Sequence, residues 1–146
     1  MNTEVAGFVK SKRFAVVGVS RDPKKFGNTI FRELKNRGYE VYGVHATSEE
    51  IAGEKCFSSL SALRGQVDAA ILCTRPEKVS ALLGEAADAG IRDVWLQQGA
   101  ESQAALDEGR RLGMNVVAGK CILMYATPVK SIHAFHRFFV KLFGKY

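Results

Sequence analysis

The chain has 146 residues and a formal net charge of +6, with 47% hydrophobic and 25% charged residues, as is typical of one ordinary globular domain. No apolar stretch is long enough to span a membrane, and the N-terminus lacks a hydrophobic signal core, so we expect a cytoplasmic protein. Three widely spaced cysteines, Cys56, Cys73 and Cys121, argue against a disulfide framework and against a zinc ribbon.

A strand, a glycine turn and a helix form the first large unit, after a short N-terminal helix that we expect to end near Lys10. Residues 14–17 are an unbroken apolar run, which is typical of a strand buried on both faces of a parallel sheet. Gly18 ends this run, and a helix is expected over residues 27–37. Such a unit presents backbone N–H groups and the positive end of a helix dipole to a phosphate.

The loop between this strand and this helix is basic. It contains Ser20, Arg21, Lys24 and Lys25, which are all able to hold phosphate oxygens. The match to the dinucleotide fingerprint G-x-G-x-x-G is poor, because Ser20 stands at the second Gly position and Gly27 comes too late. Two interpretations stay open: a phosphate-binding loop, or a turn that needs a glycine for structural reasons alone.

Strands and helices alternate along the following part of the chain, with short connections. Strands are predicted over residues 40–45, 68–73, 93–96 and 115–118, with a short edge strand over 54–57, and helices over 59–63, 76–89 and 101–112. Gly38, Gly90 and Gly113 each stand between a helix and the next strand, as helix-ending glycines do. The pattern predicts a Rossmann-like, doubly wound parallel α/β sheet in three α/β/α layers, with five main strands in the order 3-2-1-4-5.

Ligands of such sheets bind beyond the carboxyl ends of the strands, where the strand order reverses. The second predicted strand ends at Val44 and His45 and offers no acidic side chain for the ribose hydroxyls of NAD. This disfavours NAD and leaves open a ligand with an extra phosphate on its ribose. His45 either lies beside such a nucleotide or is simply a polar residue that leaves a strand.

No catalytic group or metal site can be assembled from the sequence. Cys73 and Cys121 follow predicted strands, where each is either a buried apolar cysteine or a nucleophile, but no neighbouring base is placed for the second role. His133 and His136 lack a carboxylate companion in the tail, so no metal site is expected.

The C-terminal tail, residues 128–146, is basic and aromatic. Ile132, Phe135, Phe139 and Leu142 follow helical spacing, and the tail carries four Lys or Arg residues and no acid. We expect an amphipathic helix that packs on the domain formed by residues 1–127 or on a partner in a homodimer. Contact with an anionic membrane is the alternative, and no nucleic-acid partner is expected.

Several motifs between residues 11 and 121 point together to one family. They are Val17-Gly18-Val19-Ser20-Arg21-Asp22-Pro23 followed by Lys25, Gly27 and Asn28, then Gly38-Tyr39-Glu40-Val41, Ser59-Leu60, Val67-Asp68, Arg75-Pro76-Glu77 and Trp95-Leu96-Gln97-Gln98-Gly99-Ala100. In these motifs the chain resembles the N-terminal coenzyme A-binding domain of succinyl-CoA synthetase α-subunits and ADP-forming acyl-CoA synthetases. It is most similar to the small stand-alone CoA-binding domain proteins. It departs from their pattern at Gly43-Val44-His45-Ala46 and at Gly119-Lys120.

The resemblance implies a Rossmann-type domain that holds coenzyme A by its nucleotide and diphosphate, without the catalytic histidine domain of the synthetases. The expected ligand-binding residues are Gly18, Val19, Ser20, Arg21, Lys24, Lys25, Gly27, Asn28, Val44, His45, Cys73, Thr74, Pro76, Val79, Gln98 and Gly99. In this hypothesis Lys24 and Lys25 neutralise phosphates, and Gly27 and Asn28 offer N–H groups.

Within the same set, the Ser20 hydroxyl is expected to donate a hydrogen bond to the ligand. Pro76 and Val79 would line the adenine side, and Gln98-Gly99 would border the path of the pantetheine arm.

The main functional hypothesis is non-catalytic binding of CoA or an acyl-CoA. One alternative is a CoA- or NADP-dependent enzyme that uses Cys73 or Cys121, which requires a thiol of lowered pKa. The other is an interaction protein that is regulated by its ligand and docks through its basic aromatic tail.

Overall fold

The computed structural model describes Phe8 and residues 10–20, 22, 25–47, 50–51 and 53–125. Arg21, Lys24, most of the predicted N-terminal helix and the whole predicted C-terminal helix lie outside these described residues.

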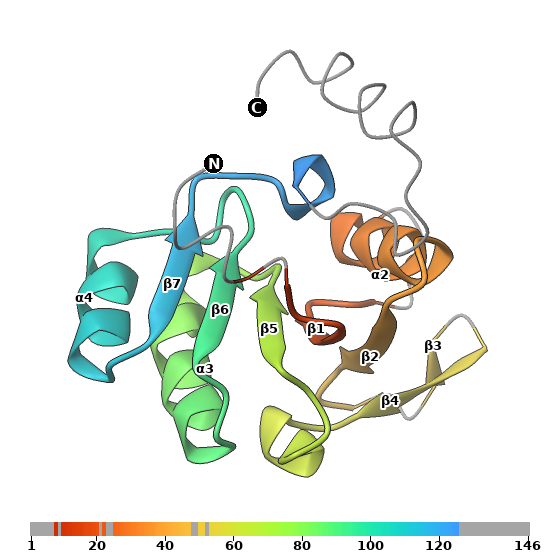
Figure 1. Cartoon of the computed structure of the whole chain (residues 1–146), viewed down its shortest axis with the longest axis horizontal. Coiled ribbons are helices and arrows are strands. Elements are labelled where there is room, and N and C mark those ends of the chain that lie inside the picture. Colours follow the sequence, from red (N-terminus) through yellow and green to blue (C-terminus); the bar gives the residue numbers. More distant parts are fainter. Residues whose placement is uncertain are drawn as a thin grey trace.

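Strands and helices alternate along the described chain, except that three strands follow one another between residues 40 and 57 (Figure 1). The strands are β1 (Arg13–Val17), β2 (Glu40–Val44), β3 (Glu50–Ile51), β4 (Glu54–Phe57), β5 (Ala69–Leu72), β6 (Asp93–Leu96) and β7 (Asn115–Ala118). The helices are α2 (Phe26–Asn36), α3 (Pro76–Asp88) and α4 (Gln103–Arg111), with single 3₁₀ turns η1 (Leu60–Leu63) and η2 (Ile122–Met124). Gly38, Gly90 and Gly113, which follow the three helices, all have positive φ, as predicted for helix-ending glycines.

The strands form one seven-stranded sheet in the order β3-β4-β2-β1-β5-β6-β7. Neighbouring strands are parallel except for the antiparallel pair β3 and β4. The predicted Rossmann-like, doubly wound class is confirmed, whereas the predicted count of five main strands and their order are wrong in detail. In the predicted order the third main strand, residues 68–73, lies beside the second, whereas β5 lies between β1 and β6 and β4 takes the place beside β2. The last predicted strand, residues 115–118, is β7 and does occupy an edge, and the β3–β4 hairpin completes the other edge.

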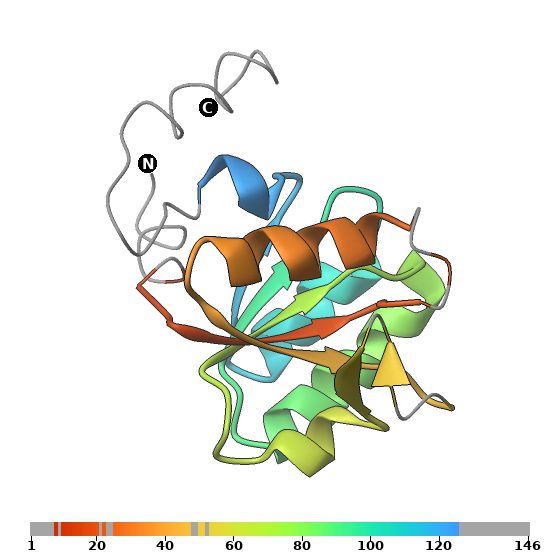
Figure 2. The same ribbon diagram turned by 90° about the vertical axis from the view of Figure 1, so that its right-hand side faces the viewer.

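Helices cover both faces of the sheet (Figure 2). In β1, Phe14 and Val16 belong to the core cluster that includes Ile30 of α2, because alternate side chains of a strand point to opposite faces. Ala15 and Val17 belong to the cluster on the other face, which α3 and α4 cover. The unbroken apolar run of β1 is thus explained by burial on both sides.

Two glycines bring the start of α2 against the end of β1. A Cβ atom on Gly27 would lie 2.4 Å from the Gly18 carbonyl oxygen, and one on Gly18 would lie 2.3 Å from the Cys73 carbonyl oxygen. Gly18 also has a φ of +113°, which side chains disfavour. The first turn of α2 therefore sits directly on the carboxyl end of β1, and Gly18 in turn lies against Cys73 at the end of β5.

The segment after β7 is tied to the sheet and to α2. The Trp95 indole N–H donates to the Lys120 carbonyl at 2.9 Å, and the Arg37 guanidinium donates to the Leu123 carbonyl at 2.9 Å. η2 itself is buried. Within the described ranges, none of the helices combines the length and apolar character that a membrane crossing needs.

Candidate functional site

An open cleft of about 660 Å³ lies at the carboxyl edge of the sheet, between the first turns of α2 and α3. It lies beside β1 and β5, which are neighbours in the sheet although β2 follows β1 in the chain. This is the place where the strand order reverses and where open α/β sheets bind ligands. The described residues that line the cleft are Gly18, Ser20, Lys25, Phe26, Gly27, Cys73, Thr74, Arg75, Pro76, Lys78, Gln97, Gln98, Gly99 and Ala100.

Most of the described residues predicted to bind the ligand meet in this cleft. They come from three separate segments: Gly18, Ser20, Lys25 and Gly27 around the β1–α2 loop, Cys73, Thr74 and Pro76 between β5 and α3, and Gln98 and Gly99 after β6. The sequence predicts that these segments meet, because the carboxyl ends of parallel strands lie at one edge of a sheet.

Other predicted residues lie elsewhere. The Val79 side chain is fully buried and Val44 is 5% exposed, both in the core between the sheet and α3. Val19 and Asn28 lie behind the loop. His45 leaves β2 half-buried, and its Nδ1 accepts a hydrogen bond from the Thr47 backbone N–H at 3.2 Å.

Asn28 shapes the loop that borders the cleft. Its Oδ1 accepts from the Ser20 N–H at 2.7 Å, and its Nδ2 donates to the Ser20 carbonyl at 2.7 Å and to the Asp22 carbonyl at 3.4 Å. Its own backbone N–H donates to the Lys25 carbonyl at 3.1 Å. In this conformation Asn28 therefore fixes the shape of the loop. The N–H groups that precede it in the first turn of α2 come before the first hydrogen bonds within the helix.

Ser20 takes part in the same loop structure and keeps hydrogen-bonding capacity. Its hydroxyl oxygen accepts from the Asp22 N–H at 3.1 Å. Because a serine hydroxyl is one donor and two acceptors, its proton is still able to donate to a ligand.

Positive charge dominates the cleft. Lys25 precedes α2, Arg75 precedes α3, and Lys78 lies in the first turn of α3. The described residues that line the cleft include no Asp or Glu. With two helix N-termini at the same place, the arrangement favours an anionic ligand.

Five residues that line the cleft are not among the predicted ligand-binding residues: Phe26, Arg75, Lys78, Gln97 and Ala100. Arg75 and Lys78 flank the predicted residue Pro76, so the predicted start of that helix was the signal that would have found them. Phe26 is the exposed large hydrophobic residue of the described chain, with 45% of its surface accessible. Gln97 gave no signal beyond its place in the Gln97-Gln98-Gly99 motif.

Cys73 lines the cleft, but its thiol is poorly suited to act as a nucleophile. Burial raises the pKa of Cys73 to about 12, with a smaller electrostatic contribution from Cys121. Burial likewise raises the pKa of Cys56. A reactive cysteine needs a lowered pKa, since the thiolate is the attacking form.

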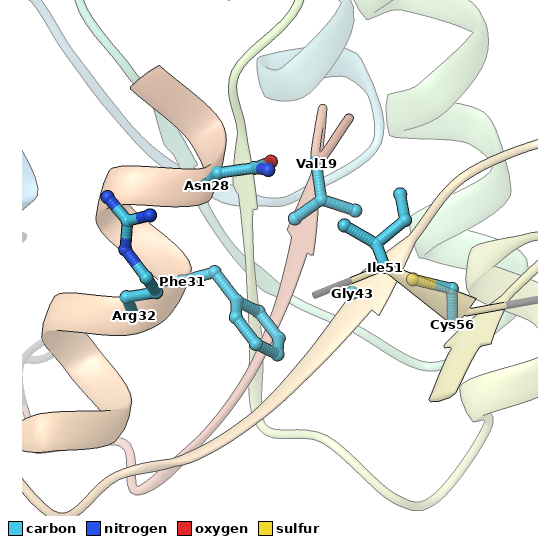
Figure 3. A pocket seen from close by; sticks show the side chains of 7 residues that line it. All are labelled: Val19, Asn28, Phe31, Arg32, Gly43, Ile51 and Cys56. Carbon is cyan, nitrogen blue, oxygen red and sulfur yellow. The ribbon is translucent and has the colours of Figure 1, made fainter. Parts of the chain in front are cut away.

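A second, much smaller cavity lies behind the loop, between α2, β2 and the β3–β4 hairpin (Figure 3). Val19, Phe31, Ile51 and Cys56 point toward one another there, while the Arg32 guanidinium points away. Its volume of about 30 Å³ is far too small for a nucleotide. No group of three or more metal-ligating side chains occurs in the described part of the chain, which does not include His133 and His136.

Comparison with known proteins places the chain in a family. A family model described as a CoA binding domain matches residues 12–127. The α-subunit of acetate–CoA ligase [ADP-forming] II from Pyrococcus furiosus is 30% identical over 126 residues, which span 79% of this chain but only 28% of the subunit. YneT from Bacillus subtilis is 30% identical over 113 residues, which span 77% of this chain and 84% of YneT.

A solved structure supports the same assignment. A conserved hypothetical protein from Pyrococcus furiosus is 34% identical and superposes with a TM-score of 0.73, covering 76% of this chain and 96% of that protein. The resemblance drawn from the sequence motifs is confirmed, and this chain belongs to the CoA-binding domain family.

Proposed function

We propose that this chain binds coenzyme A or an acyl-CoA in the cleft between α2 and α3 and carries out no chemistry on it. The observation that carries the proposal is the convergence of Lys25, Arg75 and Lys78 with two helix N-termini around one cleft that has no acidic lining residue among those described. Family membership supports CoA as the ligand.

The β1–α2 loop suits the diphosphate of this ligand. Gly18 and Gly27 both line the cleft, and neither place has room for a side chain: a Cβ on Gly27 would clash with the Gly18 carbonyl, and one on Gly18 with the Cys73 carbonyl. A phosphate can therefore approach the N–H groups of the α2 first turn, where Lys25 adds a positive charge.

The start of α3 suits a second anionic group. Arg75 and Lys78 are exposed side chains on either side of the first helical turn. The β1–α2 loop is assigned to the diphosphate of CoA, so we assign Arg75 and Lys78 to its remaining phosphate, the one on the ribose. Dephospho-CoA and NAD lack that group.

The non-catalytic part of the proposal rests on the chemistry of the lining residues. The described ones include no His, Asp or Glu that would act as a general acid or base. The single thiol among them, Cys73, has a pKa raised to about 12.

Calorimetric titration with CoA, dephospho-CoA and NAD tests the proposal. CoA should bind most tightly, dephospho-CoA more weakly because it lacks the ribose phosphate, and NAD most weakly. Equal binding of the three ligands, or no binding of any, would overturn the proposal.

A further inference from the structure

Gln97 is a buried amide at the carboxyl end of β6. It is 2% exposed and yet belongs to the lining of the cleft. Its backbone N–H donates to the Leu72 carbonyl at 3.0 Å, and its carbonyl accepts from the Ala100 N–H at 2.9 Å. The main chain is therefore satisfied, and only the side-chain amide has hydrogen bonds left to make.

The orientation of that amide is fixed by a backbone donor. The Ile122 N–H donates to Gln97 Oε1 at 3.1 Å, and because an N–H group only donates, the oxygen of the amide must face it. The Nε2 group, with its two protons, consequently faces the other way. It is buried and has no hydrogen-bond partner within the described residues.

A buried amide donor without an acceptor is costly, and native structures seldom leave one so. The neighbours of Gln97 in the cleft narrow the choice of acceptor. The lining residues beside Gln97 are uncharged: Cys73, Gln98, Gly99 and Ala100. The positively charged lining residues, Lys25, Arg75 and Lys78, stand instead at the starts of the two helices. The uncharged side suits the neutral part of CoA, the pantetheine arm, whose hydrogen-bond acceptors include amide carbonyl oxygens.

We propose that Gln97 is a specificity-determining residue, whose Nε2 donates to a carbonyl oxygen on the pantetheine arm of the bound ligand. This inference rests on the proposed function. The same amide accepts from Ile122 and donates to the ligand, so the end of β7 and η2 fix its position. Gln97 thus selects a ligand that carries the arm over a bare nucleotide.

Two variants and two ligands test this proposal by calorimetry. Gln97→Glu keeps an oxygen acceptor for the Ile122 N–H and replaces the donor by an oxygen. Gln97→Met has a similar volume and removes both polar atoms. CoA is compared with adenosine 3′,5′-bisphosphate, which carries phosphates on the same nucleoside but lacks the arm.

Gln66→Glu is the matched control, since Gln66 is exposed, precedes β5 at the opposite edge of the sheet and its side-chain amide donates to the Ala62 carbonyl at a long 3.4 Å. We expect both Gln97 variants to bind CoA about tenfold more weakly, the loss typical of one hydrogen bond. Gln97→Met adds no charge, so it should weaken binding of the bisphosphate much less than binding of CoA, and Gln66→Glu should change neither.

The outcomes separate the two proposals. If the wild type binds neither ligand, the proposed function fails and this inference falls with it. If the wild type binds both but the Gln97 variants bind CoA normally, the amide does not donate to the arm. If both ligands weaken equally, Gln97 only supports the fold, and the inference is wrong while the proposed function stands.

Discussion

At the scale of single residues, the state of the Cys73 thiol distinguishes a site that only binds its ligand from a site that uses thiol chemistry. It lies in the cleft, where a nucleophile would have to be, and burial raises its pKa to about 12. At neutral pH the sulfur is therefore a protonated thiol, with the character of a small apolar side chain.

Alkylation by iodoacetamide against pH measures this directly. Well below its pKa, the thiolate fraction of Cys73 rises with pH, so the rate should increase about tenfold per unit between pH 7 and pH 9. Peptide mapping by mass spectrometry distinguishes Cys73 from Cys56 and Cys121. If the alkylation rate of Cys73 levelled off near pH 7, the pKa of its thiol would be lowered. That result would favour the alternative hypothesis of an enzyme that uses Cys73.

The sequence predicts the place of a residue in the site where the order of elements along the chain is enough to determine it. Gly18 and Gly27 were found because a strand, a turn and a helix are consecutive in the sequence. Val79 was placed in the binding site although its helical spacing with Leu83 already put it on the buried side of α3. Gln97 was missed because its role depends on Ile122, which β7 brings beside it only in the folded chain.

At the scale of elements, the contact between α2 and β1 decides the shape of the site. The Gly27 and Gly18 backbones approach so closely that a Cβ on Gly27 would lie 2.4 Å from a carbonyl oxygen. A clash with backbone cannot be relieved by a side-chain rotation, so the whole first turn of α2 would have to move.

Gly27→Ala should therefore destabilise the protein, by about 1–3 kcal/mol, as overpacked sites do. Gly84→Ala is the control, because Gly84 lies within α3 and a Cβ there would meet nothing within 4 Å. That variant should gain about 0.5–1 kcal/mol from the better helix propensity of alanine. Urea denaturation of both variants gives the two values, and a neutral or stabilising Gly27→Ala would contradict the tight contact.

The β3–β4 hairpin shows why some elements escape prediction. A short edge strand is predicted over residues 54–57, and β4 forms there, but β3 rather than β4 lies at the edge of the sheet. β3 has only two residues, Glu50 and Ile51, and pairs back onto Lys55 and Glu54. A strand this short carries no hydrophobic period, so only its pairing reveals it.

At the scale of the whole molecule, the alternation of strands and helices along the sequence predicts the fold class. It does not predict the order of the strands in the sheet. Parallel strands joined by right-handed helical crossovers, in a number too small to close a barrel, form an open sheet with helices on both faces. Which strand lies beside β2 depends on pairings such as Phe14 with Ala69, which place β5 beside β1 instead, and nothing local in the sequence encodes them.

The tail remains a prediction from sequence, since residues 128–146 lie outside the described structure. We propose that they pack as an amphipathic helix on the domain or on a second copy of the chain. Truncation after Thr127 should then lower the melting temperature or abolish a dimer, which light scattering and thermal melting report. Unchanged melting and oligomeric state, together with lost binding to anionic vesicles, would replace this proposal by membrane contact.

The most direct test of the central claim is a CoA titration that compares two charge reversals by calorimetry. Lys25 lines the cleft at the start of α2, while Lys10 is an exposed lysine that precedes β1 at the opposite edge of the sheet. Both substitutions to Glu change the net charge equally. If the β1–α2 loop holds the phosphates of CoA, Lys25→Glu should weaken binding by about tenfold or more and Lys10→Glu by much less. Equal effects of the two variants would contradict a phosphate site at this loop.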